Sequence, residues 1–373
     1  MNNLDEMEEM TNVLLENRYD LHENQNTKKN NNNKKTKKKK GFKHKLKILA
    51  IILLVIVGVI ETGIYLFFKT DLFQEYKELW VQTAMTTMNH QYLATWFLSE
   101  NEINAIMAKL EVQNNENSDI NAINIENIEE EKKENKITVE KITGKIILFL
   151  PLFSYFLRPL CGYVMQITDC TKVKYVDGRK KSQGTKLSKI VQENDAIAGI
   201  NAGGFADPDG NGAGNILNAP VIMNQKLLYG NKNTVMSLIG LSKKGELILG
   251  KYTYSQAISN GVESAVDFGP FIIVNGNKQI KSSNAGGLHP RAAIGQKKDG
   301  TIIFVVVDGR QPGYSIGTTL QELQNIFERY DAYNAANLDG GSSATMYYDG
   351  KVVNKTSTPI GERYLPNAII VTK

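Results

Sequence analysis

The sequence predicts an α+β fold with a mixed, largely antiparallel sheet and flanking helices, preceded by an N-terminal transmembrane helix and a helical juxtamembrane region. Three observations support this prediction. A long apolar stretch covers residues 48–68, and a helical pattern of apolar residues follows it over 71–110. Between residues 220 and 285, short β segments alternate with Gly and Asn turns, which favours antiparallel sheet over repeated strand–helix–strand units.

Composition separates a charged tail from a neutral remainder. The chain has 373 residues, 42% of them hydrophobic, which is enough for a sizeable core and more than one domain. Residues 1–47 hold 12 Lys and Arg against 7 Asp and Glu, and this difference accounts for the whole net charge of +5. The neutral remainder gives no electrostatic reason to expect nucleic acid as a partner.

The N-terminal part is predicted to anchor the chain in a lipid bilayer. Residues 1–47 have little apolar content to bury and are expected to form a disordered basic tail. Residues 48–68 are long enough to span the hydrocarbon core, with Glu61 as an interior cost. The lysines before this signal-anchor helix predict a cytoplasmic N-terminus and an extracellular C-terminal domain at the cell membrane. The rival interpretation is a cleaved signal peptide, against which the long preceding region and the lack of an A-x-A site count.

Two segments connect the anchor to the rest. Residues 69–110 are predicted to form a helical juxtamembrane region, in which Trp80, Tyr92 and Trp96 form either an interfacial belt or part of a core. Residues 111–136 are rich in Asn and Glu and are expected to form a polar linker. Cys161 and Cys170 are expected to be unpaired thiols, with a bridge across a hairpin as the alternative.

A glycine-rich motif near the C-terminus, Asn337–Thr345 (NLDGGSSAT), is the strongest candidate site. It places the Asp339 carboxylate on a backbone that can approach a ligand closely, although Asp-Gly and Gly-Gly are also ordinary turn signals. It follows an amphipathic helix that begins with the capping box Thr319–Glu322. Asp308 ends the apolar strand 301–307 in a similar way, so the two carboxylates meet if their strands are neighbours. The simpler role for Asp308 is a turn residue paired with Arg310.

The predicted loops also contain candidate residues for binding a metal ion or an anion. Residues 207–212 match the first half of an EF-hand loop, but position twelve is Asn218 rather than Glu, so Ca²⁺ is a minority alternative and no cofactor is predicted. Only His289 lies in the C-terminal half, which excludes a His-rich zinc centre there. Arg291, Arg310 and Arg363 lie in predicted loops and favour an anionic, phosphorylated ligand. Nucleophile-elbow, P-loop, Rossmann and H-E-x-x-H motifs are missing from the sequence.

Six short motifs occur in a characteristic order. They are Asn201–Phe205 (NAGGF), Phe268–Pro270 (FGP), Pro290–Gly295 (PRAAIG), Val307–Arg310 (VDGR), Asn337–Ser343 (NLDGGSS) and Gly361–Arg363 (GER). In this order and spacing, residues 160–373 resemble the phosphodiester glycosidase family, which includes the lysosomal uncovering enzyme and bacterial exopolysaccharide biosynthesis proteins. The resemblance implies hydrolysis of a sugar-1-phosphodiester, with a phosphorylated glycan as substrate.

The resemblance also assigns residues to the pocket. It places catalytic carboxylates at Asp339, Asp308 and Glu362, and substrate-binding groups at Asn201, Gly203, Gly204, Phe205, Arg291, Arg310, Gly340, Gly341, Ser342 and Arg363. In the hypothesis that follows, the arginines hold the phosphate and one carboxylate can suffice, because phosphate is a good leaving group. The chain departs from the mammalian enzyme in its N-terminal anchor, so a cell-surface glycan is the expected substrate. The alternative is a non-catalytic glycan-binding module in an exopolysaccharide assembly complex.

Overall fold

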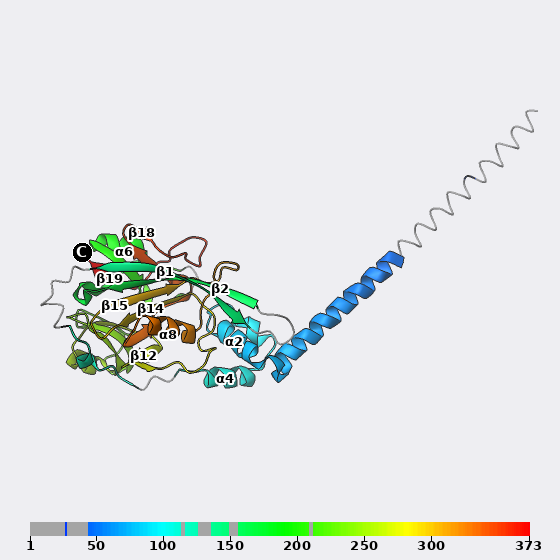
Figure 1. The fold of residues 1–373 in the computed structure, drawn as a ribbon, viewed down its shortest axis with the longest axis horizontal. Helices are drawn as coiled ribbons and strands as arrows, with labels where there is room; N and C mark the ends of the chain where they lie inside the picture. The colour runs from blue at the N-terminus through cyan, green and yellow to red at the C-terminus, as the bar shows by residue number, and fades with distance from the viewer. Residues whose placement is uncertain (1–26, 28–43, 113–115, 126–135, 149–155, 209–211) are drawn as a thin grey trace, which may run out of the picture. The chain divides into compact units, whose positions relative to one another are not determined.

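A computed structural model describes Thr27 and residues 44–112, 116–125, 136–148, 156–208 and 212–373 (Figure 1). The chain divides into two compact units, Met1–Leu72 and Phe73–Lys373. In the first unit, a helix covers His44–Lys69 with a mean hydropathy of 2.6, so it is long and apolar enough to cross a membrane by length and composition. It begins before the predicted boundary at Ile48. Most of the predicted tail, residues 1–47, lies outside the described residues.

The helices of the second unit are short and lie between or before the strands. They are α2 (Gln74–Met85), α3 (Tyr92–Thr95), α4 (Glu100–Lys109), α6 (Leu187–Glu193), α7 (Tyr254–Ser259) and α8 (Leu320–Arg329). The single-turn helices are η1 (Asp71–Phe73) at the boundary of the units, η2 (Ile120–Ala122), η3 (Cys170–Lys172) and η4 (Gly341–Ser343). The predicted capping box is present, since the Thr319 hydroxyl accepts from the Glu322 amide and the Glu322 carboxylate accepts from the Thr319 amide.

Three main sheets make up the second unit. The largest has the order β1 (Ile137–Leu148), β2 (Phe156–Ile167), β15 (Ile302–Val307), β14 (Arg291–Gln296), β16 (Asn334–Asn337), β12 (Phe271–Val274) and β13 (Asn277–Lys278). The second has the order β10 (Leu247–Tyr252), β9 (Met236–Ser242), β11 (Val262–Asp267), β7 (Val221–Met223) and β8 (Lys226–Tyr229). The third has the order β18 (Lys351–Val352), β17 (Met346–Tyr348), β4 (Ala196–Asn201), β19 (Asn367–Thr372) and β3 (Val173–Asp177). A small ribbon pairs β5 (Phe205–Ala206) with β6 (Ile216–Leu217).

Pairings between the described strands are antiparallel throughout these sheets. The predicted α+β class, with largely antiparallel sheet and flanking helices, is therefore confirmed.

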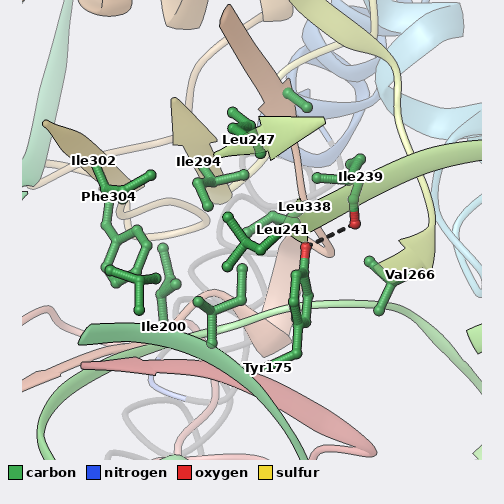
Figure 2. Packing of buried hydrophobic residues seen from close by; sticks show 14 of the residues in the cluster. Tyr175, Ile200, Ile239, Leu241, Leu247, Val266, Ile294, Ile302, Phe304 and Leu338 are labelled. Atoms are coloured by element: carbon green, nitrogen blue, oxygen red, sulfur yellow. Dashed lines mark hydrogen bonds between the residues drawn. The ribbon is translucent and has the colours of Figure 1, made fainter. Parts of the chain in front are cut away.

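The three sheets enclose one central hydrophobic cluster, and each is covered on its other face by a helix. Ile294 and Phe304 of the first sheet, Ile239 of the second and Ile200 of the third all belong to the central cluster (Figure 2). Outside it, α8 packs on the first sheet, α6 on the third and α7 on the second. This arrangement explains why 302–307 is apolar at every position: Phe304 and its alternate neighbours face the centre, while Val305 and its alternate neighbours face α8.

Part of the predicted linker packs against the sheets. Among the described residues 116–125, the Ser118 amide donates to the Leu249 carbonyl at 2.8 Å, and the Leu249 amide donates to the Ser118 hydroxyl at 2.8 Å. Ile123 and Ile125 are buried in the central cluster. These two isoleucines, within the predicted polar linker 111–136, thus pack in the core. The ordered fold also begins before residue 160, since β1 forms an edge of the largest sheet.

Cys161 and Cys170 are buried free thiols. Burial raises the pKa of Cys170 to about 12, so this thiol is protonated at neutral pH.

A hydrogen bond inside the core provides a test of this packing. The Tyr175 hydroxyl, on β3, donates to the Ile239 carbonyl of β9 at 2.9 Å and so joins two sheets across the central cluster (Figure 2). We expect Tyr175→Phe to lower the free energy of unfolding by about 1 kcal/mol, because one buried hydrogen bond is lost. Urea denaturation of the full chain in detergent micelles measures this change. The control Tyr229→Phe, at a ring that is 44% exposed, should have little effect; equal losses in the two variants would contradict the assignment.

Candidate active site

Two glycine-containing loops close on Pro290, which immediately precedes β14. The Gly341 amide donates to the Pro290 carbonyl at 2.8 Å. A Cβ at Gly340 would lie 2.7 Å from the Pro290 carbonyl oxygen, and one at Gly309 would lie 2.8 Å from the Pro290 nitrogen. Side chains do not fit at either position, so the two glycines allow the loops after β15 and β16 to meet.

The NAGGF loop after β4 joins the same place. The Asn201 amide group donates to the Asp339 carbonyl at 2.6 Å, and its oxygen accepts from the Thr345 amide at 3.0 Å. The Asp339 amide donates in turn to the Ala202 carbonyl at 2.9 Å. Asn201 is buried, with both ends of its side chain bonded to the backbone. It therefore fixes the backbone that carries Asp339.

Gly203 and Gly204 also serve close packing. The Gly203 amide donates to the Asn367 side-chain oxygen at 2.7 Å. A Cβ at Gly204 would lie 3.0 Å from the Phe268 ring, in the FGP motif. These contacts connect the first two sequence motifs to each other beside the Asp339 loop.

Asp339 is the half-buried carboxylate at the centre of the site. Burial raises the pKa of Asp339 to about 6, although the Ser343 hydroxyl, Arg363, the Gly340 amide and Arg310 act in the opposite direction. Its carboxylate thus titrates near neutrality. Because the folded chain holds this proton more tightly than the unfolded chain, the contribution of Asp339 to stability falls as pH rises from about 4 to about 6.

Arg363 is held in position on several sides. Its Nη1 donates to the Ser342 hydroxyl at 2.8 Å and its Nη2 donates to the Asp207 carboxylate at 2.9 Å. Its guanidinium carbon lies 5.0 Å from the centre of the Phe205 ring. The structure therefore brings Phe205, Ser342 and Arg363 together, with Asp207 as the partner that orients the arginine.

Arg310 faces the same loop and has no such partner. Its Nη2 would lie 3.3 Å from a Cβ built on Gly341, so the guanidinium rests against this glycine. The Arg310 side chain is exposed and makes no hydrogen bond with the part of the chain that the structure describes. Asp339 and Arg363 are both near enough to influence its charge. The site thus combines the Asp339 carboxylate with two guanidinium groups: that of Arg363, which is paired with Asp207, and that of Arg310, which is open to a ligand.

Asp308 lies at the same sheet edge but is not an immediate neighbour of Asp339. Strand β14 lies between β15 and β16, which places the two backbones about 10 Å apart. The Asp308 carboxylate accepts from the Tyr314 hydroxyl at 2.9 Å, from the Asn354 side chain at 2.9 Å and from the Lys355 amide at 3.2 Å. Asp308 is buried, and burial raises its pKa. Its oxygens are engaged in holding the loop after β18, so it supports the site rather than facing a ligand.

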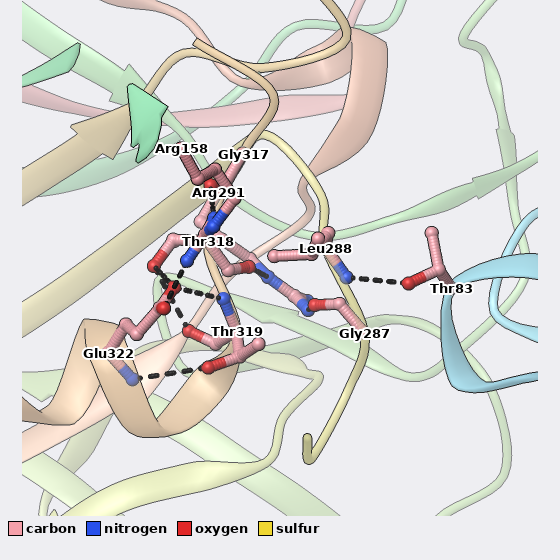
Figure 3. A network of polar contacts seen from close by, with 9 residues as sticks. All are labelled: Thr83, Arg158, Gly287, Leu288, Arg291, Gly317, Thr318, Thr319 and Glu322. Carbon is pink, nitrogen blue, oxygen red and sulfur yellow. Dashed lines mark hydrogen bonds and ion pairs between the residues drawn. The ribbon is translucent and has the colours of Figure 1, made fainter. Parts of the chain in front are cut away.

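Arg291 is buried, and Figure 3 shows its contacts with Gly287 and Thr318. Its Nη2 donates to the carbonyls of Gly286 and Gly287 at 2.5 and 3.0 Å, and its Nε donates to the Thr318 carbonyl at 3.3 Å. Burial and then Arg310 lower the pKa of Arg291 to about 10, so it stays charged at neutral pH. Arg291 thus holds these loops through backbone contacts, and its role as a phosphate ligand stays a prediction.

Glu362, predicted to be a catalytic carboxylate, contacts helix α6. Its two carboxylate oxygens accept from the Ser188 amide at 2.9 Å and from the Ser188 hydroxyl at 2.6 Å. Ser188 lies in the first turn of α6, where unsatisfied backbone amides favour a carboxylate. Glu362 therefore ties the GER loop to α6, and its neighbour Arg363 is the residue that reaches the site.

The EF-hand-like segment has a different use. One Asp207 oxygen accepts from the Gly212 amide at 2.8 Å, and the other accepts from Arg363. Asp209 and Asn211 lie outside the described residues. Within the residues that the structure describes, no group of three His, Cys, Asp or Glu side chains is placed to hold a metal ion. The Asp207 carboxylate is thus an anchor for Arg363 in this structure.

Comparison with known proteins agrees with this geometry. A family model described as phosphodiester glycosidase matches residues 194–372. The resemblance to the phosphodiester glycosidase family is thereby confirmed. The matched residues contain all the site residues named above, from Asn201 to Arg363.

Two curated relatives and one solved structure show how far the similarity extends. The SPbeta prophage-derived uncharacterized protein YomE of Bacillus subtilis (strain 168) is 31% identical over 119 residues, which is 31% of this chain and 18% of that protein. The N-acetylglucosamine-1-phosphodiester alpha-N-acetylglucosaminidase of Mus musculus is 24% identical over 224 residues, 54% of this chain and 42% of that protein. The chain thus matches less than half the length of either relative. The pro-peptide-inhibited catalytic domain of the zebrafish enzyme of the same name shares the fold, with a TM-score of 0.52 and 17% identity over 65% of this chain and 85% of that one.

Proposed function

We propose that the chain is a membrane-anchored extracytoplasmic glycosidase that hydrolyses a sugar-1-phosphodiester in a cell-surface glycan. The observation that carries this proposal is the half-buried Asp339 carboxylate with the charges of Arg310 and Arg363 near enough to act on it. A negative group and two positive groups in one site suit a substrate whose reacting carbon develops positive charge and whose leaving group is an anion. The family match supports the same reaction class.

The arginines account for the phosphate end of the substrate. Arg310 is exposed and has no protein acceptor among the described residues, so its N–H groups can donate to the oxygens of a phosphate group. Arg363, fixed by Asp207 and Ser342, supplies a second charge with a defined orientation. Amide groups and hydroxyls of the Gly340–Ser343 loop lie beside them.

Asp339 accounts for the sugar end. In the proposed step, the bond between the anomeric carbon and the phosphate oxygen breaks, and the phosphate monoester leaves with both bonding electrons. Water supplies the hydroxyl group that ends on the anomeric carbon, and its other proton is lost to Asp339 or to solvent. The ionised Asp339 either stabilises the positive carbon or activates the water. A phosphate leaving group needs no proton from the protein, so a second carboxylate is unnecessary.

The remaining predicted residues support this arrangement from outside the reacting groups. Asp308 holds the loop after β18, Arg291 holds the loops before β14 and α8, and Glu362 holds the GER loop on α6. Helix His44–Lys69 is proposed to anchor the chain, with the tail in the cytoplasm and the second unit outside.

The first prediction separates Asp339 from the other carboxylates. We expect Asp339→Asn to reduce release of free sugar from an N-acetylhexosamine-1-phosphodiester by a factor on the order of 10³ or more, because the transition state loses its carboxylate. The matched control is Glu362→Gln, which should keep most of the activity because that side chain contacts α6. Both are measured on the full chain in detergent micelles against a panel of sugars. Saturable glycan binding by a wild-type protein that releases no sugar from any panel member would support the binding-module alternative instead.

A second prediction concerns pH. Only the ionised Asp339 is active in this mechanism, so the rate should rise with pH through about 6. Arg363 lowers the pKa of Asp339, so Arg363→Gln should move this rise to higher pH in addition to weakening substrate binding. Rates under subsaturating substrate across a pH series measure the shift. An unchanged midpoint in the variant would show that the titrating group is not Asp339.

A further inference from the structure

The segment 79–98 is unusual in carrying no Asp, Glu, Lys or Arg, in a chain where these residues make up 22%. It covers most of α2, the following turn and α3. Large apolar side chains in this segment are nevertheless exposed: Trp80 is 40% exposed, Met88 63%, Tyr92 40% and Trp96 72%. An exposed surface with aromatic rings and no full charges is atypical of a face that meets bulk water.

The aromatic side chains of this segment lie near one another. The Trp80 indole nitrogen donates to the Leu93 carbonyl at 2.9 Å, which joins α2 to α3. The Tyr92 and Trp96 rings lie 4.9 Å apart, and the His90 and Tyr92 rings lie 6.2 Å apart. We refer to Trp80, Tyr92 and Trp96 as the aromatic face.

We propose that the aromatic face is a membrane-contact surface that rests in the headgroup region of the bilayer in which helix His44–Lys69 is anchored. Trp and Tyr are the residues enriched at this depth, because their rings are apolar and their N–H and O–H groups remain hydrated. The inference rests on the anchoring part of the proposed function.

The short connection between the apolar helix and α2 supports the bilayer as the partner of the aromatic face. Only residues 70–73 separate the end of the apolar helix from α2. An extended residue spans at most about 3.5 Å and a helical residue about 1.5 Å, so Trp80 lies within roughly 25 Å of the membrane end of the helix. Leu93 is hydrogen-bonded to Trp80, which keeps α3 within a similar reach.

Helix α2, which carries Trp80 of the aromatic face, contacts the segment that precedes β14. At the end of α2, the Thr86 hydroxyl lies 2.7 Å from His289 Nε2, and the Leu288 amide donates to the Thr83 hydroxyl at 3.0 Å. His289 immediately precedes Pro290, whose carbonyl binds Gly341 next to the Asp339 loop. Helix α2, which carries Trp80, is thus connected by direct contacts to the segment that supports the Asp339 loop.

Trp80 and Trp96 are the two tryptophans of the whole sequence, so their fluorescence reports on this face directly. The full chain is reconstituted in liposomes whose lipids carry bromine either near the headgroup or near the chain ends. We expect headgroup-proximal bromine to quench Trp96 in the Trp80→Phe variant more strongly than chain-end bromine, and aqueous iodide to quench it weakly. A tryptophan probe at an exposed position of β8, Tyr229→Trp with both native tryptophans replaced by Phe, should instead be quenched by iodide and not by lipid bromine.

Two results would overturn the proposal. Strong iodide quenching of Trp96 without lipid quenching would place the face in water, and protection from both quenchers would assign it to a protein contact such as a second copy of the chain. Flotation of the same liposomes checks the anchor separately. If the chain floats but shows no lipid quenching, only the proposed membrane-contact surface is refuted. If the chain does not float, the proposed anchor is refuted as well. Sugar release from a soluble phosphodiester, measured in parallel, tests the proposed reaction independently of both.

Discussion

The close approach of the backbone around Pro290 is the constraint on which the site depends. The Asp308-Gly309 and Asp339-Gly340 segments belong to different strands, and each can reach Pro290 only because its second residue lacks a side chain. Asn201 then bonds the Asp339 loop from the third sheet. The three-sheet arrangement thus delivers loops from distant parts of the sequence to one point, where a single added methyl group would separate them.

The charged side chains around this point lie in different surroundings and have different roles. Asp339 is partly withdrawn from water, which favours its protonated form, while two arginines and hydrogen bonds favour the ionised form. The balance leaves its pKa near neutrality, where a carboxylate can be both populated and reactive. The surrounding ionic groups are used differently. Arg291 and Glu362 bond backbone or helix groups, and their contribution is to fix the loops that carry Asp339 and Arg363.

Much of the fold could be predicted from sequence because its signals are local. The capping box of α8, the apolar strand 301–307 and the apolar helix near the N-terminus each follow from periodicity and turn chemistry, and the structure contains all three. The core role of Ile123 and Ile125 could not be seen, since two isoleucines in a polar segment have no period. Their burial is decided by contacts with strands far along the chain.

The site was only partly predictable for the same reason. Its motifs identified the loops, and the glycines beside Asp308 and Asp339 indicated close backbone approach. Whether a charged side chain in a loop faces a ligand or the protein depends on partners that sequence does not order, such as Ser188 for Glu362 and Asn354 for Asp308. Asp207 was visible as part of a calcium-like pattern, but its role in holding Arg363 required the fold.

The central claim is that the bond to the anomeric carbon, rather than a phosphorus–oxygen bond, is broken in a site built around Asp339. Hydrolysis of a sugar-1-phosphodiester in water enriched in the heavy oxygen isotope tests this most directly, with the products separated and analysed by mass spectrometry. The account predicts that the label enters the hydroxyl group of the released sugar and that the phosphate monoester stays unlabelled. Label in the phosphate product would contradict it, because water would then have attacked phosphorus.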